Sequence, residues 1–215
     1  MNLIHFKNDG KNNPLAPEWN CFIFETIIKN INLKNLSKYL LNKEKDILKL
    51  KKSGDGYTGL NDHTTTRHQE YNLFNFKNKE IDNLKKQIIK THNKFLEVIG
   101  LDLPKTLYGK CWYNVMKENE SIKPHAHCWD KDAYLGGHFC VQCNNTSTYY
   151  INPINQLCEP TGYKSKNEEG KLTLFQNFIP HYTDEHKGNN KRITIAFDLT
   201  VAKVHDNITI LYDHS

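Results

Sequence analysis

The second half of the chain is a succession of short apolar segments separated by turn residues. These segments are rich in β-branched and aromatic residues, and no helical period lies between them. They read "LYGKCWYNVM", "LGGHFCVQC", "STYYI", "KLTLFQNFI", "RITIAFDLTV" and "NITILYD", with a further extended segment around 121–130. Six or seven short strands without intervening helices predict an antiparallel sandwich or jelly roll.

The first half of the chain has a different pattern of apolar residues. A strand is predicted at 21–28, followed by amphipathic helices from about 35 to 51 and from about 78 to 99, the second ended by Gly100. Between the helices, residues 53–72 show no period, which predicts a long loop that is a lid, a binding segment or a disordered excursion. We expect one domain over 1–215, with 107–215 as the β core and the strand, helices and loop of 1–106 flanking it.

Composition narrows the class of protein. The net charge of +5 is spread along the chain, and the densest basic run, "KDILKLKK", has no interleaved aromatic residues. This run is typical of a solvated helix face, so nucleic acid is not an expected partner. No apolar run approaches the roughly 18 residues of a membrane span, and the first residues do not resemble a signal peptide. We expect a cytoplasmic protein without a membrane partner, and the abundant Asn and Lys are compatible with a phage-encoded protein in its host's cytoplasm.

The six cysteines are expected to be reduced thiols rather than a disulfide framework. Cys140 and Cys143 form a CxxC pattern that could supply half of a zinc site. However, the pattern lies in a strand-like run without a turn, and strand alternation sends residues three apart to opposite faces. We therefore do not expect structural zinc here.

The segment "HAH" suggests a metal site. In an extended segment, His125 and His127 project from the same face, close enough to share one ion. A third ligand is available in His181, which follows the strand-like run "LTLFQNFIP". The alternative interpretation is that these histidines are ordinary polar groups at the rim of a sheet.

Arg192 begins a strand eleven residues after His181. Alternation places Arg192, Thr194 and Ala196 on one face, and a buried arginine beside a hydroxyl suits a carboxylate ligand. The intervening "DEHKGNNK" predicts a hairpin that would bring Arg192 next to His181. Alternatively, Arg192 could pair with Asp184 or Glu185.

Three other histidines have less specific expectations. His138, in "GGHF", is expected to be a core or pocket-wall residue rather than a fourth ligand. His63 and His68 lie on the long loop, where solvent-facing side chains are expected.

The order of these motifs resembles a known family. "HAH", "YLGGHF", the "GKLTLF" strand leading to "PH", and Arg-x-Thr-x-Ala-Phe are similar to the iron(II)- and 2-oxoglutarate-dependent oxygenases, in particular a bacterial and phage branch with His-x-His followed by a distant His and Arg. The resemblance covers 107–200 well and 54–100 loosely. It implies a double-stranded β-helix with His125, His127 and His181 at Fe(II), and a reaction with dioxygen that converts 2-oxoglutarate to succinate.

The resemblance also implies how the co-substrate would be held. Arg192 and Thr194 would bind the distal carboxylate of 2-oxoglutarate, and Asn114, in "CWYNVM", would line the same cavity. The wider family has His-x-Asp or His-x-Glu, so His127 stands where a carboxylate is expected. Asp130 or Asp132 could restore that charge, either at the metal or through a hydrogen bond to an imidazole.

Two rival functions remain open at this stage. A cupin also begins with His-x-His, and it would bind metal, with Asp132 as an acidic ligand, but would not need 2-oxoglutarate. A non-catalytic jelly-roll binding module would need neither. The residues do not indicate the substrate, which could be a small molecule or a macromolecule.

Overall fold

The computed structural model describes residues 1–8, 15, 19–54, 56–127, 132–153, 161–204 and 206–214. In these ranges the chain is mainly β. The strands are β1 (Asn2–Asn8), β2 (Trp19–Ile27), β3 (Thr106–Met116), β4 (Ala133–Gln142), β5 (Ser147–Ile151), β6 (Gly162–Lys166), β7 (Lys171–Gln176), β8 (His181–Thr183), β9 (Arg192–Thr200) and β10 (Thr209–Asp213). The helices are α1 (Leu33–Ile47) and α2 (Lys79–Ile99), with short 3₁₀ turns η1 (Thr64–Arg67) and η2 (Leu73–Asn75).

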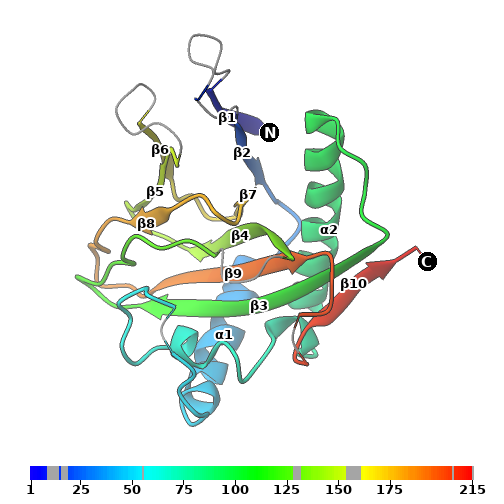
Figure 1. Cartoon of the computed structure of the whole chain (residues 1–215). Coiled ribbons are helices and arrows are strands. Elements are labelled where there is room, and N and C mark those ends of the chain that lie inside the picture. The colour runs from blue at the N-terminus through cyan, green and yellow to red at the C-terminus, as the bar shows by residue number, and fades with distance from the viewer. Residues whose placement is uncertain are drawn as a thin grey trace.

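The strands form two antiparallel sheets. The large sheet has the order β1-β2-β7-β4-β9-β3-β10, and the small sheet has the order β6-β5-β8. Figure 1 shows the long strands β4, β9 and β3 side by side, as their pairing requires. The predicted fold class, a mainly β double-stranded β-helix flanked by helices from the N-terminal half, is confirmed.

The two helices pack against one face of the large sheet, where α1 lies behind β9 and β3 in Figure 1. Leu40 of α1 and Phe95 of α2 belong to the same buried cluster as Ile195 and Phe197 of β9. Since alternate residues of a strand point to opposite faces, the polar residues of β9 project away from the helices. The helices therefore close one side of the sheet and leave its other side to form a site.

The boundaries of the second helix follow from its sequence. The Asn78 side chain accepts hydrogen bonds from the backbone N–H groups of Glu80 and Ile81, which caps the first turn of α2. Gly100 adopts a left-handed conformation with φ of 73°, as the C-terminal end of a helix favours, so the predicted end is confirmed. Neither helix of the described residues has the length and apolar character needed to cross a membrane.

Three features differ from the sequence-based expectations. β1 forms within the first residues, which look polar, because it is an edge strand that pairs only with β2. Strands β6 and β8 were likewise not predicted, and α1 ends at Ile47 rather than near residue 51. All three missed strands lie at sheet edges, where one exposed side permits polar residues.

The predicted hairpin between His181 and Arg192 is wrong. Strand β8 pairs with β5 in the small sheet, whereas β9 pairs with β3 and β4 in the large sheet. The connection between them therefore passes from one sheet to the other. As a result, His181 and Arg192 come from different sheets, although both line the same cavity.

Candidate functional site

Three histidines, the ones singled out in the sequence, converge in the structure. His125 and His181 face each other across an isolated antiparallel bridge, in which each backbone N–H donates to the other's carbonyl at 3.1 and 2.9 Å. The backbone N–H of His127 donates to the Asn177 carbonyl at 2.8 Å, which fixes the second histidine of the pair. One ring nitrogen from each histidine lies within 4.8 Å of the others. Metal-binding geometry thus arises from two segments that the backbone holds together.

Hydrogen bonds at Nδ1 set the tautomers of two of these rings. Nδ1 of His125 lies 2.9 Å from the Lys123 carbonyl, and Nδ1 of His181 lies 3.1 Å from the Ile179 carbonyl. A carbonyl only accepts, so each Nδ1 carries the proton and each Nε2 keeps its lone pair. Burial, reinforced by His125 and His127, holds the pKa of His181 well below its usual value. The ring of His181 is therefore neutral and ready to act as a ligand without losing a proton.

Asp198 orients the third imidazole. Its Oδ1 lies 2.5 Å from Nδ1 of His127, and both side chains are buried. Nε2 of His127 lies 3.3 Å from Nε2 of His125, so these two ring nitrogens face the same space. A carboxylate bonded to the far nitrogen of a ligating histidine fixes its tautomer and increases its basicity. The arrangement is a three-histidine site with one negative charge behind it.

This carboxylate was missed in the sequence. Of the two candidates considered there, Asp132 does not belong to the converging group and Asp130 lies outside the described residues. Asp198 instead supplies the charge through the second of the two routes considered, a hydrogen bond to an imidazole. The signal was available, because the alternation that places Arg192 and Thr194 on the inner face of β9 continues to Asp198.

A cavity of about 850 Å³ adjoins the three histidines and extends along the inner face of the large sheet. Its floor contains Arg192, Thr194 and Asp198 from β9. On the neighbouring strand β3, Asn114 lies opposite Thr194, and Met116 lies opposite Arg192. The structure thus brings Arg192, Thr194 and Asn114 into one cavity with the histidines.

Several polar atoms in this cavity lack a partner. Nε of Arg192, Oγ1 of Thr194, Oδ1 of Asn114 and Nε2 of His138 are buried without a hydrogen bond to any described residue. Leaving a buried polar group unpaired costs about 1–3 kcal/mol. Four such atoms in one cavity indicate that a polar ligand completes their hydrogen bonding. The donors among them, Arg192 and Thr194, fit a small anion with several oxygens, whereas the Asn114 oxygen accepts and fits a donor.

The alternative partners considered for Arg192 are occupied elsewhere. Asp184 accepts the backbone N–H of Ser147 at 2.7 Å, and Glu185 lies 3.7 Å from the Lys187 ammonium. Among the described residues, no carboxylate forms an ion pair with Arg192, which is 1% exposed. A buried guanidinium without a counter-ion favours the binding of a carboxylate ligand.

The CxxC pattern behaves differently from its sequence-based interpretation. A register shift between Cys140 and Gln142 interrupts the alternation of β4, so the two cysteines do not project to opposite faces as expected. The Cys140 thiol hydrogen-bonds to Cys143 and lowers the pKa of Cys143, to which nearby Arg192 also contributes. The pair therefore packs beside the arginine at the deep end of the cavity.

Comparisons with known proteins agree on the fold. No protein-family model and no curated protein matches the chain. Among solved structures, a prolyl-4-hydroxylase from Pseudomonas putida has a TM-score of 0.56 at 8% identity, over 83% of this chain and 91% of that one. A non-heme alpha-ketoglutarate-dependent epimerase of nogalamycin biosynthesis has a TM-score of 0.56 at 10% identity, over 88% and 93%. A 2OG-Fe(II) oxygenase-family oxidoreductase from Burkholderia pseudomallei has a TM-score of 0.50 at 10% identity, over 85% and 87%.

The chain has the fold of the 2-oxoglutarate- and Fe(II)-dependent oxygenases. The resemblance found in the sequence motifs and the resemblance found in the fold therefore agree. At such low identity the likeness extends to the fold alone, and the roles of individual residues have to be argued from their own geometry.

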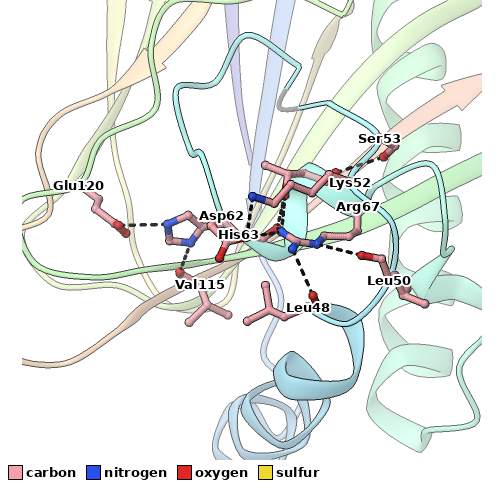
Figure 2. Close-up of polar contacts among 10 residues, drawn as sticks. Leu48, Leu50, Lys52, Ser53, Asp62, His63, Arg67, Val115 and Glu120 are labelled. Carbon is pink, nitrogen blue, oxygen red and sulfur yellow. Dashed lines mark hydrogen bonds and ion pairs between the residues drawn. The ribbon is translucent and has the colours of Figure 1, made fainter.

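The long loop between the helices is anchored, as Figure 2 shows. The expectation that His63 faces solvent is wrong: its Nδ1 bonds to the Val115 carbonyl of β3 at 2.8 Å, and its Nε2 lies 3.0 Å from Glu120. Arg67 is 5% exposed and donates to the carbonyls of Leu48 and Leu50 at 3.1 and 3.4 Å. The segment therefore holds the end of α1 against the sheet.

His68 also differs from the expectation of a solvent-facing side chain, because it lines the cavity. Its Nδ1 lies 3.0 Å from the Thr65 carbonyl, so Nδ1 carries the proton and Nε2 is an acceptor. Burial lowers the pKa of His68 below its usual value, which keeps the ring neutral. The base of the loop is thus structural, and residues such as Tyr57 and Gln69 form the outer wall of the cavity.

Proposed function

We propose that the chain is an Fe(II)- and 2-oxoglutarate-dependent oxygenase, with hydroxylation of a substrate C–H bond as its outcome. His125, His127 and His181 would hold the metal through Nε2. The observation that carries the proposal is that three converging imidazoles line one cavity with a buried arginine whose Nε has no hydrogen-bond partner among the described residues.

The donor set fits iron. Three neutral imidazoles suit a divalent first-row metal and leave coordination positions for other ligands. Because none of the three carries a charge, the site would be one unit more positive than one with the usual carboxylate. Asp198 compensates at a distance, since its hydrogen bond to His127 makes that imidazole a more basic ligand.

The unpaired polar atoms fit the co-substrate. Arg192 would bind the distal carboxylate of 2-oxoglutarate, and the Thr194 hydroxyl would donate to it. His138 would donate to the rest of the molecule through Nε2, and Asn114, opposite Thr194, would line the same cavity. Bound iron and 2-oxoglutarate together supply the oxidising chemistry, in which dioxygen is consumed, succinate and carbon dioxide are released and a C–H bond is oxidised.

The residues of the chain have three tasks in such a reaction. They orient the co-substrate between Arg192 and the metal, hold the imidazoles in one tautomer, and keep water from the deep end of the cavity. The last task follows from burial, because Arg192 and Met116 are 1% and 0% exposed.

The test is a pair of anaerobic calorimetric titrations, first with Mn(II) and then with 2-oxoglutarate, on the wild type and on Arg192→Ala. We expect one metal per chain in both proteins, and 2-oxoglutarate affinity at least about 100-fold weaker in the variant, since a charged hydrogen-bonding partner is lost. Arg192→Lys, which keeps the charge but not the planar fork, should fall between the two.

Each result discriminates between functions. Succinate formation by the Fe(II)-loaded wild type supports the oxygenase. Metal binding without 2-oxoglutarate binding would indicate a cupin-like protein, and binding of neither would indicate a non-catalytic module. Equal affinity for 2-oxoglutarate in wild type and Arg192→Ala would remove Arg192 from its proposed role.

A further inference from the structure

A second cationic group lines the cavity. Lys110 of β3 is 5% exposed, and its ammonium donates to the carbonyls of Asn207 at 3.1 Å and Gln69 at 3.4 Å. An ammonium has three donors, so one N–H remains for another partner. Within the described part of the chain, no carboxylate forms an ion pair with Lys110.

A charge in such surroundings is energetically unfavourable. Its two known partners are neutral carbonyls, which compensate only part of the lost hydration. Burial accordingly lowers the pKa of Lys110 to about 8. At neutral pH most molecules still carry the charge, and an anion that reached the third N–H would remove the imbalance.

Lys110 lies far from the proposed co-substrate pocket. It is six residues before Met116, the residue paired with Arg192, which corresponds to about 20 Å along the strand. A diacid as short as 2-oxoglutarate cannot reach both cations. The cavity therefore has two separate positions for anionic groups.

The wall next to Lys110 has the features of a binding surface. Trp112 is two residues further along the same face of β3, and its ring lies 5.9 Å from that of His127 and 5.8 Å from that of His68. An indole face is a large rigid contact surface. The free Nε2 of His68 offers one hydrogen-bond acceptor beside it.

We propose that Lys110 binds the anionic group of the substrate, a carboxylate or a phosphate, while the body of the substrate lies against Trp112 and donates a hydrogen bond to His68. This inference rests on the proposed function, because it places the substrate in the part of the cavity that the co-substrate leaves free. A substrate held at Lys110 and Trp112 would extend toward His127 and so toward the metal.

Acidic groups near Lys110 do not prevent this binding. Asp198 lies opposite Lys110 in the strand pairing, but its carboxylate is bonded to His127 and faces the metal site. Asp206 of the cavity wall and Glu70, whose charge raises the pKa of Lys110, are both exposed, so water and salt screen them. A divalent metal at the histidines would add positive charge and favour an anionic substrate further.

The test uses fluorine NMR with three probes on protein loaded with Mn(II) and saturated with 2-oxoglutarate, without oxygen. The probes 4-fluorobenzoate and 4-fluorobenzamide have nearly the same shape and differ in charge, and 4-fluorophenyl phosphate tests the other anion. Mn(II) broadens the fluorine signal of a probe that binds near it. We expect at least one anion to bind about tenfold or more tightly than the amide, because a hydrogen bond between charged groups replaces a neutral one.

Variants identify Lys110 as the cause. Lys110→Met keeps the length of the side chain without its charge, and should abolish the preference for the anion. Lys110→Arg keeps the charge and should retain it. The inference is overturned if the amide binds as tightly as both anions, or if Lys110→Met keeps the preference while its melting temperature and 2-oxoglutarate affinity match the wild type.

The same experiment separates this inference from the proposed function. If the wild type binds no Mn(II) or no 2-oxoglutarate, the proposed function fails, and the probes are then compared by ordinary line broadening in the metal-free protein. An anion preference lost in Lys110→Met would still support the Lys110 site, and no preference would overturn it.

Discussion

The substitution Asp198→Asn tests how much the carboxylate bonded to His127 contributes to metal binding at the three-histidine site. The side chain keeps its shape, and its amide oxygen can still accept the proton on Nδ1 of His127, so the substitution mainly removes charge. A metal on Nε2 would lie about 7 Å from the carboxylate, given a metal–nitrogen bond of about 2.1 Å. At an effective dielectric constant of about 20, the attraction of a divalent ion to this carboxylate is about 5 kcal/mol.

The net effect on binding should be smaller than that attraction. The same carboxylate also stabilises the metal-free imidazole, and removal of comparable groups behind ligating histidines weakens metal binding about 10- to 100-fold. This range corresponds to about 1.4–2.7 kcal/mol. We expect Asp198→Asn to fall within it.

The assay is anaerobic competition for Mn(II) and Fe(II) between the protein and a chelator, followed by thermal melting with and without metal. The matched control is Asp132→Asn, which removes the same charge from a residue outside the converging group. Wild-type metal affinity in Asp198→Asn would refute the reasoning. So would an equal loss in the control, because the effect would then depend on net charge alone.

Three further outcomes are expected. His138→Phe should weaken 2-oxoglutarate binding several-fold without changing Mn(II) affinity, as measured by calorimetry. Because burial, with a contribution from nearby cationic groups, lowers the pKa of His138 to about 3, the ring is neutral and the loss should be the same at pH 6 and pH 8. Gly137→Ala should lower stability by about 3 kcal/mol in urea unfolding, because its Cβ would overlap the Phe197 ring, and an unchanged midpoint would contradict this. Arg67→Met should cost about 2–3 kcal/mol of stability in the same assay, since the Leu48 carbonyl and its neighbours lose a charged donor; a stable variant would mean that the loop base is dispensable.

The parts of the fold that could be predicted are those encoded locally. The end of α2 at Gly100 and the long strands follow from periodicity and end signals within each segment. Strand β1 and the path from His181 to Arg192 could not be read, because strand pairing depends on contacts between distant segments. A connection of eight residues permits either a hairpin or a crossing between sheets, and only the packed sheets decide.

The site, like the fold, has residues that local sequence patterns predict and others that depend on contacts between distant segments. Spacing and order in the sequence identified His125, His127 and His181 as candidates. Their convergence depends on a backbone bridge that the sequence pattern does not predict. Asp198 and Lys110 were missed, although alternation along β9 and β3 places them on the inner face. A charged residue on the inner face of a buried strand is a signal for a partner or a ligand, because it is costly when unpaired.

The order of groups along this inner face predicts an order of binding. Arg192, at the deep end, is 1% exposed, whereas Tyr57 in the outer wall is 86% exposed. A substrate anchored at Lys110 would therefore lie between bound 2-oxoglutarate and the solvent, so the co-substrate should bind first and leave last. Saturating 4-fluorobenzoate, or the phosphate probe if that binds better, should slow the release of 2-oxoglutarate from the Mn(II)-loaded wild type in a stopped-flow displacement experiment. Lys110→Met should show no such slowing, and an unchanged release rate in the wild type would mean that the two ligands reach the cavity by separate routes.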